Sequence, residues 1–104
     1  MTRTFNSGAK RDSNEGKENY SVNVSALALR RYAQYMTGKA NLYGEGNYLK
    51  GIPSKECLES LLRHINKYLI EKQTGIVVED SDHLSACIFN IFCIMHNEEN
   101  EKEN

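Results

Sequence analysis

Two glutamates, Glu56 and Glu59, lie three residues apart in a segment whose leucine spacing predicts a helix. Residues at i and i+3 face the same side of a helix. Two carboxylates placed there can share a divalent cation such as Mg²⁺, which prefers oxygen ligands. The simpler interpretation is a solvated edge beside the leucines. Glu56 and Glu59 are therefore candidate metal ligands, with the solvated edge as the alternative.

Two further groups carry histidine. Arg63 and His64 are adjacent on the same predicted helix. The planar guanidinium of arginine suits phosphate, and an imidazole can serve as a ligand, a base or a hydrogen-bonding group. Asp82 and His83 come at the predicted start of another helix, where an acidic residue also acts as a cap. The functional interpretation makes Asp82 a metal ligand and His83 a binding residue opposite His64.

Asn90 stands in a run of otherwise apolar or small residues, from Ala86 to Met95. A buried amide without a partner costs about 1–3 kcal/mol, so Asn90 must meet a backbone group, another subunit, His64 or a ligand. His83 and Asn90 are seven residues apart and share one helix face. We therefore predict that both line one pocket.

A glycine-rich segment, residues 38–51, carries tyrosines and lysines. Glycines allow close backbone approach, tyrosines stack on bases and lysines meet phosphates. The glycine spacing is not a dinucleotide fingerprint, and no strand precedes it. The alternative is a plain connection between helices. As binding residues the segment contributes Lys39, Tyr43, Asn47, Tyr48 and Lys50.

Three helices must position these residues. Apolar residues at helical spacing predict one helix from about residue 23 to about residue 38, a second over 55–72 and a third from about 81 to 97. The fold class is therefore mostly α. The third helix is apolar nearly all round, which is typical of a helix buried on more than one side. Its second apolar side is predicted to meet another subunit.

Caps and connections follow from local residue types. Ser21 or Asn23 is predicted to cap the first helix and Ser54 the second. The apolar stretch 76–78 is short for a strand and is predicted to be an extended connector.

Composition separates the chain into three parts. Residues 1–20 are polar and are predicted to be flexible unless a partner or ligand orders them. Residues 21–97 form the helical domain, and residues 98–104 form an acidic, solvated tail. A chain of 104 residues buries a modest share of its surface, which favours a homo-oligomer.

Charge and hydropathy narrow the partners and the location. Residues 1–50 hold eight Lys/Arg against four Asp/Glu, whereas residues 51–104 hold five against ten. The basic half suits an anionic partner, and the acidic half disfavours a long nucleic acid. No run of 18 apolar residues predicts a membrane span, and no secretory signal is expected. Three cysteines indicate a reducing, cytoplasmic setting.

The segment from Gly38 to Ile52 resembles the pattern Gly-Ala-Lys-Lys-Tyr-Gly-x-x-Asn-Trp-x-Lys-Gly of small phage proteins. The same proteins continue with Arg-His, then Asp-His-Leu, then an alanine-rich helix with an asparagine. Here these blocks are Arg63-His64, Asp82-His83-Leu84 and Ala86–Asn90. Upstream, Ser7–Asp12 resembles their Gly-x-Lys-x-Asp opening, which adds Lys10 and Arg11 as binding residues.

The resemblance covers roughly residues 7–96 and is to the N-terminal domain of phage dATP/dGTP diphosphohydrolase. It implies cleavage of a purine deoxynucleoside triphosphate to monophosphate and pyrophosphate, with a divalent metal. Related all-α pyrophosphohydrolases hold Mg²⁺ with several carboxylates on helices. Glu56, Glu59 and Asp82 are candidates here, but the usual Glu-Glu-x-x-Glu and Glu-x-x-Asp sets are absent. Tyr48 takes the place of the family's tryptophan.

Two functions follow as hypotheses. The first is a binding protein of the host-cell cytoplasm that sequesters a nucleotide-derived defence signal in a helical homo-oligomer and needs no cofactor for binding. The second is a Mg²⁺-dependent nucleoside triphosphate diphosphohydrolase. A structural oligomer without a small ligand is the third alternative.

Overall fold

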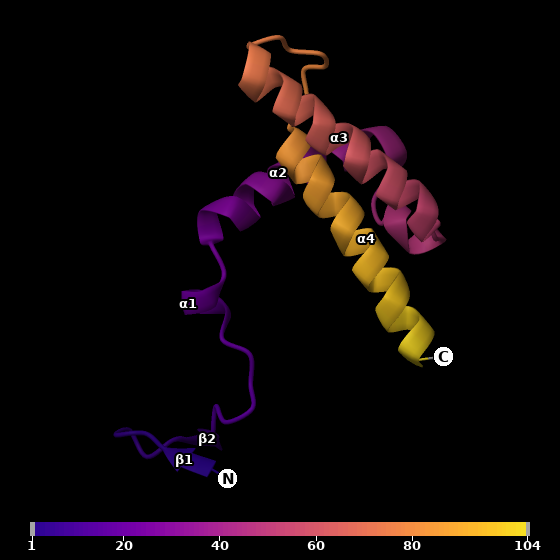
Figure 1. Ribbon diagram of the computed structural model, residues 1–104. Coiled ribbons are helices and arrows are strands. Elements are labelled where there is room, and N and C mark those ends of the chain that lie inside the picture. Colours follow the sequence, from indigo (N-terminus) through magenta and orange to yellow (C-terminus); the bar gives the residue numbers. More distant parts are fainter. Residues whose placement is uncertain (1, 104) are drawn as a thin grey trace.

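The computed structural model describes residues 2–103 and is mostly helical, as the sequence predicts. Its body consists of α2 (Ala26–Tyr43), α3 (Ser54–Thr74) and α4 (His83–Glu103) (Figure 1). A 3₁₀ turn, η1 (Asn47–Lys50), lies between α2 and α3 within the glycine-rich segment. Within residues 2–103, no helix is long and apolar enough to cross a membrane.

The N-terminal segment contains structure that the sequence did not predict. Strands β1 (Thr2–Thr4) and β2 (Lys10–Asp12) pair in an antiparallel hairpin, and a one-turn helix, α1 (Tyr20–Asn23), follows. Every residue of both strands is exposed, and the hairpin lies away from the helices (Figure 1). The radius of gyration is therefore 18.8 Å, against about 13 Å for a compact domain of this length.

Helix α2 is capped by Ser25 at its N-terminus and by Gly44 at its C-terminus. Ser25 accepts a hydrogen bond from the Ala28 backbone N–H at 3.2 Å and is the N-cap. The prediction of Ser21 or Asn23 was wrong, because both belong to the separate turn α1. The helix continues through Gly38 and stops at Gly44, whose φ of +87° favours glycine.

Helices α3 and α4 form an antiparallel hairpin. The prediction that Ser54 caps α3 was wrong: Ser54 is the first helical residue, and its hydroxyl accepts from Asn97 Nδ2 at 3.0 Å. The connector between the helices contains no strand, as predicted. Helix α4 runs to Glu103, past the predicted end at residue 97. The acidic tail contains no glycine or proline, and its glutamates are good helix formers.

The buried core is small and lies between α3 and α4. Among the described residues it consists of four apolar or sulfur residues and three polar ones: Cys57, Ala86, Cys87, Cys93, His83, Ser85 and Asn90. Helix α2 crosses one face of this pair, where Tyr32 packs edge-on against Phe92 with ring centroids 5.3 Å apart. Burial raises the pKa of Tyr32 to about 12, so the phenol stays neutral.

Candidate functional site

A cavity of about 520 Å³ lies between α2, η1 and the α3–α4 pair. Its walls combine aromatic, glycine and polar side chains. The lining residues used below are Lys39, Tyr43, Asn47, Tyr48, His64 and Asn90. This volume falls in the range of small-molecule sites, which are largely apolar with a few placed polar groups.

The turn after α2 brings the two tyrosines to the cavity. Gly44 and Gly46 have φ values of +87° and +68°, which let the chain reverse direction between α2 and η1. A Cβ added at Gly46 would also lie only 3.2 Å from Cδ1 of Leu49. Tyr43 and Tyr48 consequently both line the cavity from opposite ends of the turn. Tyr48 also packs edge-on against His96.

Asn90 is the most buried of the polar residues in the cavity wall, at 6% exposed. Its Nδ2 donates to the Ala86 carbonyl at 2.8 Å and to Ser60 Oγ at 3.3 Å. Both amide hydrogens are therefore used within the protein. Among the described residues, no buried side-chain polar atom lacks a partner. The hydrogen bonds of Asn90 involve Nδ2 and not Oδ1, so Oδ1 is not a fully buried atom. Its lone pairs are available to a ligand in the cavity.

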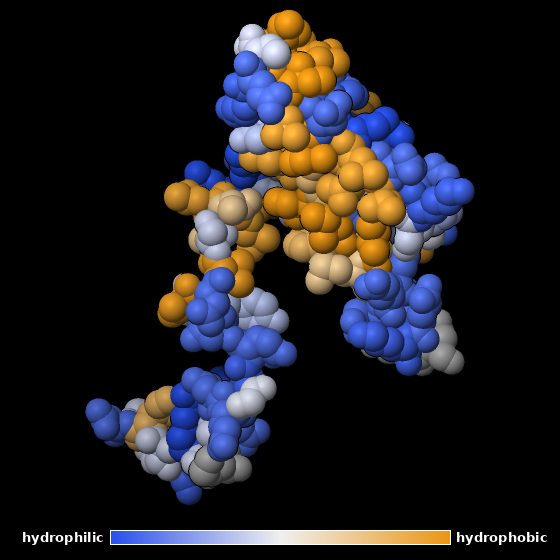
Figure 2. Space-filling view, viewed as in Figure 1, coloured by the Kyte–Doolittle hydropathy of each residue, from blue (hydrophilic) through white to orange (hydrophobic). Residues whose placement is uncertain are grey.

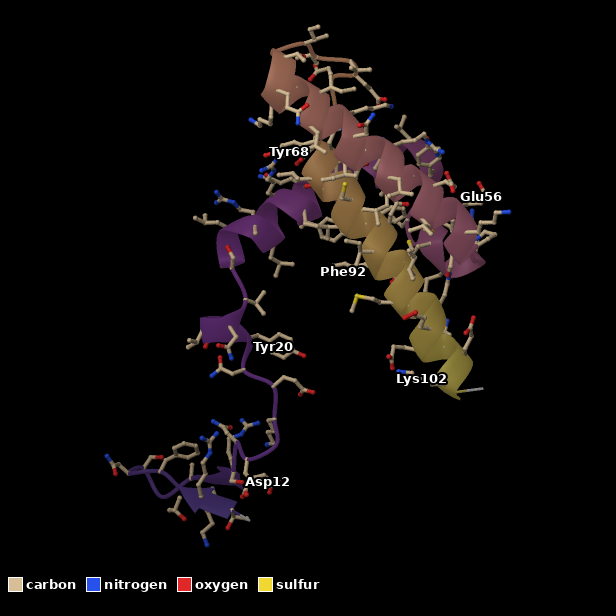
Figure 3. All side chains as sticks on the ribbon, in the orientation of Figure 1. Asp12, Tyr20, Glu56, Tyr68, Phe92 and Lys102 are labelled. Carbon is tan, nitrogen blue, oxygen red and sulfur yellow. The ribbon has the colours of Figure 1, made fainter. Side chains whose placement is uncertain are left out.

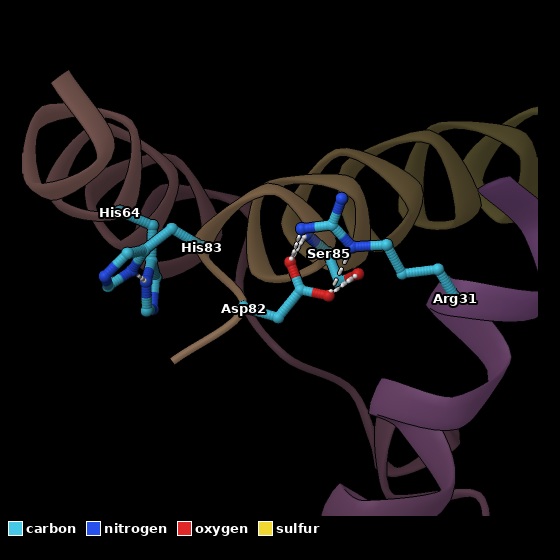
Figure 4. Close-up of polar contacts among 5 residues, drawn as sticks. All are labelled: Arg31, His64, Asp82, His83 and Ser85. Atoms are coloured by element: carbon cyan, nitrogen blue, oxygen red, sulfur yellow. Dashed lines mark hydrogen bonds and ion pairs between the residues drawn. The ribbon is translucent and has the colours of Figure 1, made fainter. Parts of the chain in front are cut away.

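His64 and His83 form the second polar feature. Their Nδ1 atoms are 2.9 Å apart (Figure 4). His83 Nε2 is 3.0 Å from the Glu79 carbonyl oxygen. A carbonyl only accepts, so in the neutral pair His83 donates from Nε2 and accepts at Nδ1. His64 then donates from Nδ1, which leaves its Nε2 as an acceptor. Burial first, and His83 second, lower the pKa of His64 and favour this neutral state.

The carboxylate of Asp82 is held by hydrogen bonds from Arg31 and Ser85. Arg31 Nε and Nη2 donate to its two carboxylate oxygens at 2.8 and 2.7 Å, and the Ser85 backbone N–H and hydroxyl donate at 3.2 and 2.7 Å (Figure 4). The guanidinium of Arg31 holds the pKa of Asp82 at about 2. Asp82 therefore caps α4 and ties it to α2.

The structure brings six of the predicted binding residues to one cavity and places the others elsewhere. The residues that line it are Lys39, Tyr43, Asn47, Tyr48, His64 and Asn90. His83, which was predicted to share the pocket wall with Asn90, is not among the lining residues and contacts His64 instead. Lys10 and Arg11 lie in the distant hairpin. Lys50 and Arg63 are exposed and outside the lining. Whether any of these residues binds a ligand stays a prediction.

The candidate metal ligands do not gather. Glu56 and Glu59 are exposed on α3, and Glu56 projects from its outer edge (Figure 3), whereas Asp82 pairs with Arg31. Within residues 2–103, no group of three or more His, Cys, Asp or Glu side chains is placed to hold a metal ion. The cavity wall carries one carboxylate, Glu45. One copy of the described chain therefore does not fit the Mg²⁺ site that related enzymes build from several carboxylates.

Several cavity residues were not predicted. Tyr35, Ser60 and Phe89 line the wall, and Lys39 Nζ lies 5.4 Å from the Tyr35 ring centroid. The spacing could have identified part of this set, because Tyr35 and Lys39, like Ser60 and His64, are four residues apart on one helix. Phe89 is indistinguishable in sequence from the other apolar residues of α4.

A family model described as dATP/dGTP diphosphohydrolase, N-terminal, matches residues 7–104. The chain belongs to this family. The match spans the cavity and both helices of the α3–α4 pair, so the lining residues all fall within the family domain. No curated protein and no solved structure matches the chain.

Proposed function

We propose that this chain binds a purine nucleotide in the cavity between α2, η1 and the α3–α4 pair. The supporting observation is that a cavity of about 520 Å³ combines two tyrosines with the acceptors of Asn90 and His64. Adenine and guanine both carry amino hydrogens at their edges that such acceptors recognise. Tyr43 and Tyr48 stack on the base, and Lys39 meets a phosphate.

We further propose that the chain sequesters the molecule that it binds. The nucleotide-derived molecule, a signal of host defence in a phage setting, is held intact in the pocket of a homo-oligomer. Glu56 and Glu59 share α3, but Asp82 is engaged by Arg31, and no third His, Cys, Asp or Glu of the described residues joins the two glutamates. This supports binding over cleavage, because a metal that neutralises charge on a transferred phosphoryl group is held by several ligands. Binding by these residues requires no cofactor.

The alternative is Mg²⁺-dependent cleavage of a purine deoxynucleoside triphosphate with release of pyrophosphate. The family description supports it. This function requires carboxylates beyond those that the described chain brings to its cavity, for example from a second chain.

One experiment separates the two functions. The purified chain is incubated with dATP, dGTP, a cyclic dinucleotide and ADP-ribose, each with and without Mg²⁺, and the protein is then removed by heat before chromatography. Recovery of intact ligand only after denaturation supports sequestration. Metal-dependent release of pyrophosphate contradicts it, and the absence of both binding and release contradicts both proposals.

Replacing Tyr43 with alanine will weaken binding of dGTP or dATP roughly 5- to 150-fold, because stacking contributes about 1–3 kcal/mol per base. Titration calorimetry measures the change. Tyr20→Ala is the matched control, since Tyr20 is an exposed tyrosine outside the cavity. An equal loss in both variants would contradict the stacking role.

Binding will also depend on pH through His64. The neutral ring offers Nε2 as an acceptor, and the lowered pKa of His64 extends this state below the ordinary value of about 6.5. Affinity is therefore flat from pH 8 to about 6.5 and falls below this range, as protonation converts the acceptor to a donor. His64→Gln will flatten the profile, whereas His96→Gln will not. A wild-type profile that rises with acid would contradict this role.

A further inference from the structure

The hairpin of α3 and α4 has two faces, which are defined by the line of contacts between the helices. Along that line Asn97 bonds Ser54, Asn90 bonds Ser60 and the Cys87 thiol contacts the Leu61 carbonyl. Residue numbers fall on α4 as they rise on α3, so the helices are antiparallel. In such a pair, the residues that follow the contact positions on both helices lie on the same side.

One face is covered by the rest of the chain. On α4 the positions 89, 92 and 96 share a stripe. Phe89 lines the cavity beneath α2, Phe92 packs on Tyr32 and His96 packs on Tyr48. The cavity therefore opens on this side of the hairpin.

The opposite face is bare. It carries six exposed apolar residues. Leu62 and Ile91 directly follow contact positions, and the others continue the same stripes at intervals of three or four residues. We call this surface the open face: Leu58, Leu62, Ile65, Leu69, Ile91 and Met95. Leu62 and Met95 are each 52% exposed. Figure 2 shows a continuous hydrophobic surface over both helices, on the side that α2 leaves uncovered in Figure 1.

The residue pattern of this face is that of a helix–helix contact. The four α3 residues are spaced by four, three and four positions, which is the repeat that packs one helix against another in a coiled coil. None of the six side chains is charged. Such a surface is self-complementary, because apolar residues meet apolar residues when two copies are related by a two-fold axis.

The size of the face fits a second copy. Helices of 21 residues are roughly 30 Å long, and two of them side by side span roughly 20 Å, which gives about 600 Å² per copy. Stable interfaces bury about 600–1,000 Å² per partner. The described residues of one copy bury only seven side chains, three of which are polar. A single copy therefore has little apolar burial, and a second copy on the open face would add to it.

We propose that the open face is the interface of a homodimer, in which two α3–α4 hairpins pack face to face as a four-helix core. The two cavities then lie on the outer sides. This assignment is independent of what the cavity binds, because it rests on the face that the cavity does not use.

Sedimentation equilibrium of the full chain tests the interface. The wild-type protein is expected at twice 11.9 kDa, about 23.8 kDa. Leu62→Glu and, separately, Met95→Glu halve this mass, because each places a charge in the apolar contact. Both side chains are half exposed in one copy, so each variant keeps its helical circular dichroism. Leu27→Glu is the control, since Leu27 is 72% exposed on α2 and outside the face.

A wild-type mass of one chain would overturn the proposal, as would an assembly that survives both substitutions. Dissociation by Leu27→Glu alone would place the contact on α2 instead of the open face and would also overturn the proposal. Nucleotide binding is measured separately on the same samples. A dimer that binds no nucleotide leaves the interface standing and removes only the proposed function.

Discussion

Replacing Asn90 with leucine is expected to reduce nucleotide affinity at least about tenfold, the equivalent of one lost hydrogen bond of about 1.4 kcal/mol. Leucine has the same number and branching of side-chain heavy atoms as asparagine but offers no acceptor to the cavity. The Ala86 carbonyl belongs to helix α4, and Ser60 is partly exposed, so neither partner is left buried without a hydrogen bond. The variant therefore keeps its fold while it loses the ligand contact.

The chain provides a closely matched control for this substitution. Asn97 lies two turns further along α4 and makes the same kind of contacts, from Nδ2 to a backbone carbonyl and to a serine hydroxyl. It does not line the cavity. Asn97→Leu is expected to change stability by a similar amount and affinity hardly at all. Calorimetric titration with dGTP measures both variants, and equal affinities would contradict the role of Asn90.

The comparison of Asn90 with Asp82 shows where sequence is informative. Asn90 was identifiable because an amide in an apolar helix needs a partner, and the structure places it in a cavity wall. Asp82 has a residue type that suits both a metal and a helix cap, and its position before α4 does not separate the two. Arg31, 51 residues away, decides its environment. A contact over that distance leaves no periodic signal in the sequence.

The helices and strands likewise differ in how well local sequence predicts them. The helices α3 and α4 were predictable because their apolar residues recur with helical periodicity. The N-terminal hairpin was not, since its strands are polar and fully exposed. The cap of α2 was misassigned because Ser21, Asn23 and Ser25 compete within a few residues. At α3 the helix begins one residue earlier than predicted, so Ser54 is its first residue and Pro53 holds the cap position. Helix α4 extends to Glu103 because the glutamates after residue 97 favour helix and no glycine or proline there ends it.

Replacing Asp82 with alanine is expected to lower the free energy of unfolding by roughly 2–4 kcal/mol. The substitution removes the N-cap of α4 and leaves the buried Ser85 hydroxyl without its acceptor. Ser85 is 1% exposed, and its hydroxyl donates to Asp82. The ion pair itself contributes little, because the Arg31 side chain is 57% exposed. Arg31→Ala should therefore cost at most about 1 kcal/mol.

The control is Glu79→Ala. Glu79 pairs with Lys67 at the surface, and that hydrogen bond lowers its pKa, but an exposed pair contributes about 0–1 kcal/mol. Thermal unfolding at one fixed protein concentration measures all three variants, since assembly would shift the midpoint. A drop of several degrees for Asp82→Ala, with Glu79→Ala near wild type, is the expected order.

Acid provides an independent test of the same contact. The folded pKa of Asp82 is about 2, below the value of about 3.9 for an unfolded aspartate. The stabilisation is therefore complete above about pH 4 and is lost as the pH falls toward 2. The difference in stability between wild type and Asp82→Asn should narrow across this window. A difference that stays constant down to pH 2 would show that the carboxylate charge has no part in joining α2 to α4.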